Sequence, residues 1–270
     1  MDILQALILG IVQGATEFLP VSSSGHLVLV PWWLGWNPPG LVFDTTLHLG
    51  TIVAVIVYFY RDLLDIVVAW LHGLAGRGMT PKAWLGWWLI LGTIPAAVLG
   101  FLFEDFFESM FGTPPVVAAL LVVTGVILAV SERLGRRRRA LDKLGWLDAV
   151  IIGCAQAVAI APGISRSGTT IAAGLLRGLR REEAARFSFL LSIPVIVGAG
   201  LMQLLHLARE AQPAGQTTLL AIGFVAAAVT GYVAIRFMLR YLEQRSLYPF
   251  AIYCWVAGAV SLIAALTHIV

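Results

Sequence analysis

The sequence has few charged residues, which make up 12% of its 270 positions. A soluble domain carries about 25% charged residues, so this chain has too few to hydrate the surface of a soluble domain of its length. Its two cysteines are too few for a disulfide-stabilised scaffold. Because 59% of the residues are hydrophobic, a disordered chain is excluded as well. The composition therefore predicts an integral membrane protein.

Long apolar stretches are the feature that the sequence does have. A membrane-spanning helix needs about 20 mostly apolar residues. We expect an all-α polytopic fold with six such transmembrane helices: residues 41–60, 83–103, 114–130, 187–207, 217–235 and 247–269.

Two further apolar stretches, residues 1–36 and 145–179, contain residues that do not suit lipid. The first includes Glu17, Pro20 and His26, and the second includes Pro162 and Arg166. Irregular backbone at membrane depth survives only where protein or a water-filled cavity surrounds it. Each stretch is therefore predicted to be a re-entrant helix–loop–helix hairpin that enters and leaves the membrane on one side.

These two stretches also match each other. At one constant offset, five residues of the first recur in the second: Gly10, Gln13, Ser22, Ser24 and Gly25 match Gly153, Gln156, Ser165, Ser167 and Gly168. A weaker match pairs residues 95–101 with 226–232. An odd number of spans separates the hairpins, so we expect an inverted-topology repeat. Within one membrane domain, repeat 1 covers about residues 1–131, repeat 2 about residues 145–245, and the final helix residues 247–269.

Basic residues gather on one side of this arrangement. The side that holds the connections after residues 60, 130, 179 and 235 receives every one of the 18 lysines and arginines except Arg166 and Arg209. Glu104, Asp105 and Glu108 fall on the other side. Because cytoplasmic loops carry the excess of basic residues, we expect both termini outside. The net charge of +3 then indicates topology and not nucleic-acid binding. No cleavable signal peptide is expected, since the amino terminus has no basic leader.

The first hairpin brings acid, hydroxyl and imidazole groups to membrane depth. Gln13 and Glu17 are four residues apart and share one face of a helix, and their oxygen atoms suit a hard cation such as Mg²⁺ or Ca²⁺. The run from Ser22 to His26 combines hydroxyls with an imidazole, the components of a nucleophile and a proton carrier. Two alternatives stay open: Glu17 as a structural partner of Arg166, and the serines as helix caps.

The second hairpin has the features of an anion site. A glycine- and serine-rich turn before an apolar helix presents backbone N–H groups to an anion. Arg166 adds a planar donor fork that matches phosphate oxygens. Opposite a glutamate and a histidine, this turn predicts a metal-assisted attack on the phosphate of a lipid.

These motifs resemble those of the undecaprenyl-diphosphate phosphatases, also called bacitracin-resistance proteins. The resemblance covers nearly the whole chain and depends on Gln13-x-x-x-Glu17, Pro20-Val-Ser-Ser-Ser-Gly-His26 and Pro162-Gly-Ile-Ser-Arg-Ser-Gly168. It implies an enzyme of the bacterial inner membrane that hydrolyses undecaprenyl diphosphate to undecaprenyl phosphate and inorganic phosphate, and so recycles the carrier lipid of cell-wall synthesis. The family permits Glu or Gln at position 13, so a metal site here has one carboxylate fewer.

The resemblance also implies roles for individual residues in a divalent-metal-dependent reaction. Ser23 is the expected nucleophile and His26 the acid/base, although which of the two makes the covalent attack stays open. Glu17 and Arg166 complete the catalytic set, and Gln13 and Glu17 are the expected metal ligands. Expected contacts to the substrate come from Gly163, Ser165, Ser167 and Thr170.

A transporter or flippase of a lipid phosphate is the second hypothesis, because inverted repeats with broken helices are common in carriers. A carrier needs an anion site but no nucleophile facing a carboxylate, and this favours the phosphatase. Asp44 and His48, four residues apart, either extend the metal site or serve as polar packing. The arginine run 136–139 is interpreted as a topology anchor. The sequence leaves open whether the protein is a homodimer.

Overall fold

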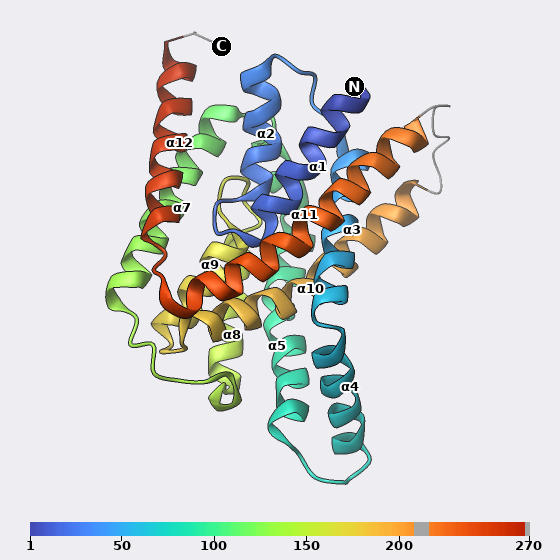
Figure 1. Ribbon diagram of the computed structural model, residues 1–270, viewed down its shortest axis with the longest axis vertical. Coiled ribbons are helices and arrows are strands. Elements are labelled where there is room, and N and C mark those ends of the chain that lie inside the picture. The colour runs from blue at the N-terminus through green and yellow to red at the C-terminus, as the bar shows by residue number, and fades with distance from the viewer. Residues whose placement is uncertain (208–215, 268–270) are drawn as a thin grey trace.

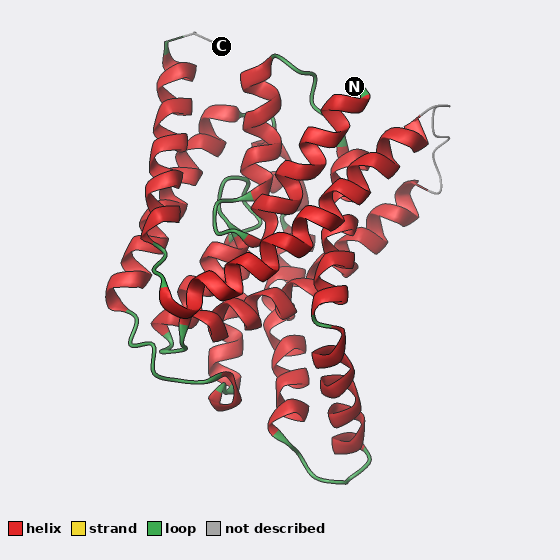
Figure 2. Cartoon of the chain, in the orientation of Figure 1, coloured by secondary structure: helices red, strands yellow, loops and turns green. Residues whose placement is uncertain are grey.

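The computed structural model describes residues 1–207 and 216–267. Within these residues its regular secondary structure is helical, with no β-strand. Figures 1 and 2 show the helices and the connections between them. The helices are α1 (Ile3–Phe18), α2 (Ser23–Leu34), α3 (Leu41–Tyr58), α4 (Tyr60–Leu74), α5 (Pro81–Leu102), α6 (Glu104–Phe111), α7 (Pro114–Leu134), the 3₁₀ turn η1 (Leu141–Lys143), α8 (Trp146–Val158), α9 (Arg166–Leu176), α10 (Arg181–Leu207), α11 (Gln216–Gln244) and α12 (Tyr248–Leu266).

Among the described residues, five helices are long and apolar enough to cross a membrane: α3, α5, α7, α11 and α12. They correspond to five of the six predicted spans. The remaining prediction, residues 187–207, falls in α10, which has 27 residues but is not among the five. The side chains of residues 201–207 lie outside those that the structure describes, so the crossing of this helix stays a prediction.

Several helices have other bounds than the spans predicted from the apolar stretches. Helix α7 continues past residue 130 to Leu134, and α11 continues past residue 235 to Gln244. Residues 60–74, expected to begin a loop, form α4. The predicted final helix 247–269 is shorter, with α12 at Tyr248–Leu266. In α7 and α11 the apolar stretch ends before the helix does, because long arginine side chains reach water from a helical backbone.

The helices of the two predicted hairpins are short. α1 and α2 have 16 and 12 residues, and α8 and α9 have 13 and 11. None of the four reaches the length of about 20 residues that a spanning helix needs. Their lengths therefore agree with helices that turn back before they cross.

Glycines allow the first helix of each hairpin to approach a neighbouring long helix closely. A Cβ atom built on Gly10 of α1 would lie 2.6 Å from the carbonyl oxygen of Gly223 in α11. A Cβ atom built on Gly153 of α8 would lie 2.4 Å from the carbonyl oxygen of Gly92 in α5. Any larger residue would push these backbones apart. The four glycines thus fix where the two hairpins sit among the other helices.

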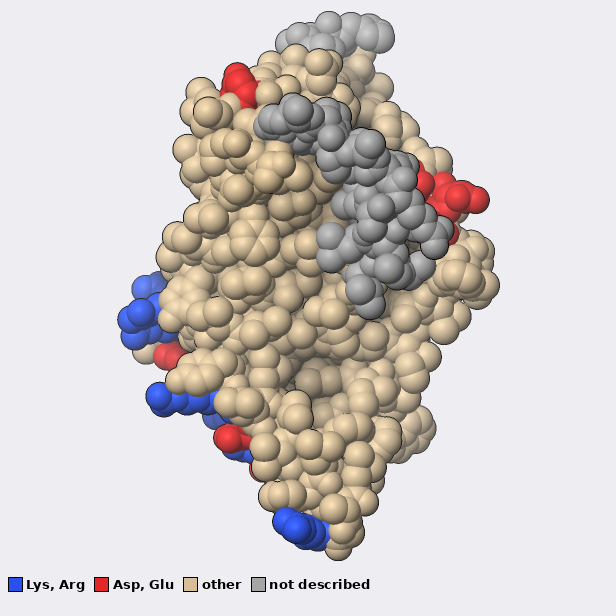
Figure 3. All heavy atoms as spheres, turned by 90° about the vertical axis from the view of Figure 1, so that its right-hand side faces the viewer, with Lys and Arg blue, Asp and Glu red and all other residues tan. Residues whose placement is uncertain are grey.

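Helix α4 and the adjoining part of α5 extend away from the other helices (Figure 1). Ile66 is the one buried residue within α4, so this helix contributes little to the core. On the face drawn in Figure 3, the lysine and arginine side chains lie in the lower part of the molecule, on the side toward which α4 extends. On this face the basic residues therefore gather at one end.

Candidate active site

The turns of the two hairpins contact each other inside the helix bundle. A Cβ atom on Gly25 would lie 3.3 Å from the Cα of Gly163, and one on Gly168 would lie 3.4 Å from the Cβ of Pro20. The Ser167 hydroxyl donates to the carbonyl oxygen of Leu19 at 3.0 Å. The turns of the two hairpins therefore meet.

A serine begins the second helix of each hairpin in the same way. The Ser22 hydroxyl oxygen accepts a hydrogen bond from the Gly25 N–H at 3.2 Å and caps α2. The Ser165 hydroxyl oxygen accepts one from the Gly168 N–H at 3.0 Å and caps α9. The cap alternative therefore holds for Ser22, because an N-cap side chain satisfies an N–H that the helix leaves free.

Ser22 also has an unusual backbone conformation, with φ of 69°. A non-glycine residue with positive φ is strained, and such residues cluster at functional sites. This conformation turns the chain sharply from the end of α1 into α2. It directs the next residue, Ser23, toward the side chain of Glu17.

Glu17 is the centre of the polar cluster, with 6% of its surface exposed. Its Oε1 atom accepts a hydrogen bond from Arg166 Nη2 at 2.6 Å. Its Oε2 atom accepts from the Ser23 hydroxyl at 2.5 Å and from Gln13 Nε2 at 2.9 Å. One buried carboxylate therefore joins a serine of the first hairpin to an arginine of the second.

Arg166 is held by both hairpins and by α10. Besides Glu17, it donates from Nη1 to the carbonyl oxygen of Ser188 at 3.2 Å. Its side chain is 15% exposed, so the ion pair with Glu17 lies in a site largely withdrawn from solvent. A buried charge of this kind is costly without a partner, and Glu17 supplies that partner.

The expected substrate contacts occupy different positions around this pair. Thr170 is buried, and its hydroxyl bonds to the Ser188 hydroxyl at 2.6 Å and to the Arg166 carbonyl oxygen at 2.8 Å. Gly163 has φ of 97°, and its carbonyl oxygen accepts from the Thr124 hydroxyl at 2.9 Å. The hydrogen bonds of Thr170 and Gly163 therefore hold the turn of the second hairpin against α10 and α7.

His26 and Ser23 have different hydrogen-bond partners. Its Nδ1 atom is 2.8 Å from the carbonyl oxygen of Ser22, and its Nε2 atom is 2.6 Å from the hydroxyl of Tyr253 in α12. Among the described contacts, Ser23 bonds to Glu17 and not to His26, and the acid/base role expected of His26 stays a prediction. Sequence reasoning missed Tyr253, since nothing in the pattern of α12 marks it.

His48 approaches the same carboxylate from α3. Its Nε2 atom lies 3.8 Å from Glu17 Oε2, and its Nδ1 atom is 2.8 Å from the carbonyl oxygen of Asp44. Within the described residues, two buried oxygens near this position have no hydrogen-bond partner, Gln13 Oε1 and Asp44 Oδ1. His48 is thus a neighbour of the site, whereas sequence reasoning favoured polar packing.

The polar cluster does not form a closed metal cage. No group of three His, Cys, Asp or Glu side chains within the described residues is arranged to hold a metal ion. Mg²⁺ does not need such a cage, because it commonly uses one or two carboxylates together with water and substrate phosphate. The free Gln13 Oε1 beside the Glu17 carboxylate fits an open site of that type.

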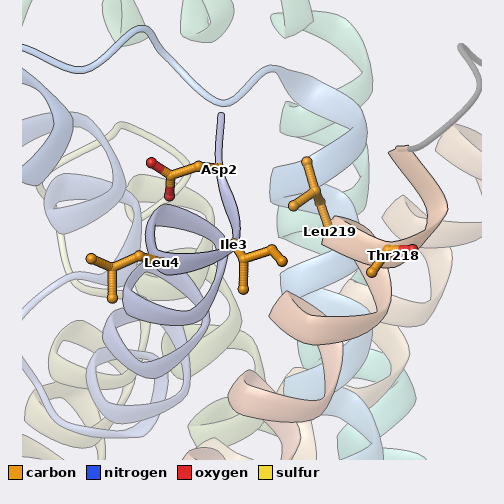
Figure 4. Close-up of a pocket in the computed structure, with 5 residues that line it drawn as sticks. All are labelled: Asp2, Ile3, Leu4, Thr218 and Leu219. Carbon is orange, nitrogen blue, oxygen red and sulfur yellow. The ribbon is translucent and has the colours of Figure 1, made fainter.

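The pocket in Figure 4 lies elsewhere. Asp2, Ile3, Leu4, Thr218 and Leu219 line it, at the start of α1 and near the start of α11. None of these residues belongs to the polar cluster. The chemistry of the site therefore comes from the meeting hairpins and not from this surface pocket.

Fold and site together define a polytopic membrane protein in which a carboxylate, a serine hydroxyl and an arginine converge. The chain belongs to the bacitracin resistance protein BacA family, which matches residues 6–260. It is 50% identical to an undecaprenyl-diphosphatase of Rubrobacter xylanophilus over 98% of both chains. It is 46% identical to one of Pelobacter propionicus over 100% of this chain and 99% of that one.

Proposed function

We propose that this protein is an integral membrane undecaprenyl-diphosphatase, which hydrolyses undecaprenyl diphosphate to undecaprenyl phosphate and inorganic phosphate. Membership of the family and the names of its relatives support the substrate. The observation that carries the chemistry is the buried Glu17 carboxylate, bonded to the Ser23 hydroxyl and to the Arg166 guanidinium. These three groups are a proton acceptor, a nucleophile and a phosphate-binding cation.

The first chemical step forms a bond between Ser23 Oγ and the terminal phosphorus. Glu17 accepts the hydroxyl proton as the oxygen attacks, because its Oε2 atom lies within hydrogen-bond distance of that hydroxyl. The anhydride bond to the bridging oxygen breaks, and undecaprenyl phosphate leaves. Water then cleaves the phosphoserine, releasing inorganic phosphate and restoring the serine.

Arg166 stabilises the transferred phosphate. Its planar fork can hold two phosphate oxygens at once, and the amino-terminal end of α9, where it stands, favours anions. The fork is bonded to Glu17 and to the Ser188 carbonyl oxygen. Substrate binding therefore exchanges a carboxylate for a phosphate, and Glu17 becomes free to accept a proton.

We also propose a divalent cation, Mg²⁺ or Ca²⁺, held by Gln13 and Glu17. Gln13 Oε1 is a buried amide oxygen with no hydrogen-bond partner, and carbonyl and carboxylate oxygens are the ligands that these cations prefer. When bound, the cation would neutralise charge on the diphosphate. Substrate oxygens and water would complete its coordination.

The proposed architecture has six crossings, including α10, and two re-entrant hairpins related as an inverted repeat. Matching contacts support the repeat. Ser22 and Ser165 cap α2 and α9 in the same way. The first helix of each hairpin also packs through glycines on a long helix of the other repeat. Gly10 of α1 contacts Gly223 of α11, and Gly153 of α8 contacts Gly92 of α5.

The proposed location is the bacterial cell membrane, with both termini and the site facing outward. The asymmetry of basic residues supports this orientation. A cysteine in place of Glu108 should react with an impermeant thiol reagent added to intact cells, whereas one in place of Arg138 should not. The reverse labelling pattern would place the site on the cytoplasmic side.

Phosphate release from purified protein tests the function. In detergent with Mg²⁺ and undecaprenyl diphosphate, the wild type should release inorganic phosphate, and Ser23→Ala should lose nearly all of this activity. Ser24→Ala is the matched control, because the Ser24 hydroxyl lies near Ser22 at 3.3 Å and not on Glu17. A lipid-phosphate carrier would release no phosphate in detergent, so an inactive wild type would favour the transporter hypothesis.

A further inference from the structure

Tyr253 joins the last helix of the chain to the first hairpin. Its hydroxyl is 2.6 Å from Nε2 of His26, although 227 positions separate the two residues. The rings are stacked, with centroids 5.6 Å apart and planes 10° apart. Both the hydroxyl and the ring of Tyr253 therefore constrain the imidazole.

The contacts of His26 determine which nitrogen carries the proton. Nδ1 faces the carbonyl oxygen of Ser22 at 2.8 Å, and a carbonyl oxygen can only accept a hydrogen bond. Nδ1 must therefore carry hydrogen. In the neutral ring the lone pair is then on Nε2, and the Tyr253 hydroxyl donates to it.

The neighbours of His26 agree with the neutral ring. Among the ion pairs that the described residues form, none includes His26, whereas His48 has Glu17 at 3.8 Å. His26 is 8% exposed and Tyr253 is 45% exposed. The imidazole is therefore enclosed, and Tyr253 stands between its Nε2 atom and the exterior of the protein.

We propose that Tyr253 is a positioning residue, which holds His26 in the Nδ1–H tautomer with its Nε2 lone pair directed toward α12. The proposal rests on the proposed hydrolysis, because it assigns how His26 takes part. Glu17 serves Ser23 directly, so His26 does not need to deprotonate the serine. Its accepting nitrogen takes a proton of the water that cleaves the phosphoserine: the water oxygen bonds to phosphorus, the bond from phosphorus to Ser23 Oγ breaks, and Glu17 returns its proton to that serine oxygen. The Tyr253 hydroxyl, which donates to Nε2 before this step, fixes the direction of the nitrogen and gives way to the water proton.

Tyr253→Phe tests the proposal, because it retains the stacked ring and removes the hydroxyl. We expect kcat to fall about 5- to 10-fold, as for the loss of one hydrogen bond that aims a reacting group, with KM unchanged and a small decrease in the thermal unfolding temperature, because one hydrogen bond is lost. Tyr248→Phe is the matched control: Tyr248 belongs to the same helix and is 42% exposed. This control should behave as the wild type.

A double-mutant cycle separates positioning from packing. His26→Asn and His26→Asn/Tyr253→Phe should have the same activity, because Tyr253 acts only through His26. Independent, multiplicative losses would overturn the proposal. Wild-type activity for Tyr253→Phe would overturn it as well.

A spectroscopic measurement is independent of catalysis. With ¹⁵N-labelled histidine, His26 should show a protonated Nδ1 and an unprotonated Nε2 that accepts a hydrogen bond. In Tyr253→Phe the Nε2 resonance should move to the position of a nitrogen without that bond. A proton on Nε2 in the wild type, or an unchanged Nε2 resonance in the variant, would overturn the contact. Failure of the proposed function would instead appear as absent phosphate release from a wild type with the expected spectrum.

Discussion

Buried carboxylates bind arginine in two regions of this protein, and their surroundings differ. We call the first region the hairpin site, formed by Glu17, Ser23 and Arg166. We call the second region the arginine clamps. They are Glu132 with Arg137 and Arg181, and Asp148 with Arg139 and Arg177.

Each clamp carboxylate is surrounded by donors. Glu132 accepts from Arg181 and from the Leu247 N–H at 3.1 Å, and it forms an ion pair with Arg137 at 3.1 Å. Asp148 accepts from the two arginines of its clamp, at 2.7 and 2.6 Å, and from the Gly145 N–H at 3.0 Å. Two guanidinium groups and a backbone N–H thus surround each carboxylate, and within residues 1–207 and 216–267 no hydroxyl donates to either one.

The hairpin site has fewer cationic side chains than a clamp, and it contains oxygen atoms that have no hydrogen-bond partner. Glu17 has one arginine, the Ser23 hydroxyl and the Gln13 amide nitrogen, and two acceptor oxygens in this region, Gln13 Oε1 and Asp44 Oδ1, have no partner. In the clamps, the buried side-chain atom without a partner among the described residues is a donor, Arg137 Nε. Buried polar groups are normally satisfied, so unsatisfied ones need an explanation such as an unplaced ion or a catalytic role. The comparison indicates that the clamps hold helices together and that the hairpin site is prepared for a ligand.

The largest effect should follow from Glu17→Gln, which removes the proton acceptor of Ser23. Because general base catalysis contributes about 10²- to 10⁴-fold, we expect phosphate release to fall about 10³-fold. The variant should still insert in the membrane and elute as a folded protein in detergent. Glu132→Gln is the control from the clamps and should keep its turnover in the fraction that folds. If Glu17→Gln were fully active, the distinction between the two regions would be lost.

Arg166→Lys should have the second-largest effect, because lysine keeps the charge but loses the two-pronged geometry. We expect kcat/KM to fall about 10²-fold, near the loss of about 2.7 kcal/mol for one donor to a transition state. Arg177→Lys makes the same change in a clamp and should leave kcat/KM within about twofold. Near wild-type efficiency for Arg166→Lys would show that its charge only anchors the hairpin.

The sequence predicted the hairpin site better than it predicted the clamps. Glu17 and Arg166 stand out because ionisable residues are costly inside apolar segments, and the matching hairpins implied that their turns meet. The clamps use arginines that resemble an ordinary topology signal. In the run 136–139, Arg137 and Arg139 turn inward to Glu132 and Asp148, and such pairing depends on how distant helices pack.

Two other features, the contact between Tyr253 and His26 and the helix α4, could not be predicted from sequence patterns. Tyr253 and His26 come from opposite ends of the chain, and a single tyrosine in an apolar helix carries no signal of its partner. Helix α4 has 15 residues and is amphipathic, so it does not meet the length criterion for a span, and the sequence predicts a loop there. Composition therefore gave the helical class and most spans, whereas contacts between distant segments required the structure.

The third effect concerns stability in a clamp. Asp148→Asn leaves Arg139 and Arg177 facing a neutral side chain. Breaking a fully buried pair costs about 3–5 kcal/mol, and since both arginine side chains are about one-third exposed, we expect about 2 kcal/mol. Thermal unfolding in detergent should therefore shift to lower temperature, while turnover per folded molecule stays unchanged. A drop in turnover without a shift in unfolding would place Asp148 in the catalytic machinery.

The smallest effect should follow from Gln13→Leu, and it tests the unused oxygen atom directly. If Gln13 Oε1 binds the cation, its loss should raise the half-saturating Mg²⁺ concentration about tenfold, which corresponds to about 1.4 kcal/mol. The rate at saturating Mg²⁺ should change little, since Glu17 and the substrate phosphates remain. The matched control is Gln156→Leu, at the corresponding position of the second hairpin, where both amide atoms are also buried without a partner but no glutamate follows four residues later. Its Mg²⁺ titration should match that of the wild type. Equal titrations for all three proteins, or activity that survives a chelator, would remove Gln13 from the cation site and leave its free oxygen without a ligand.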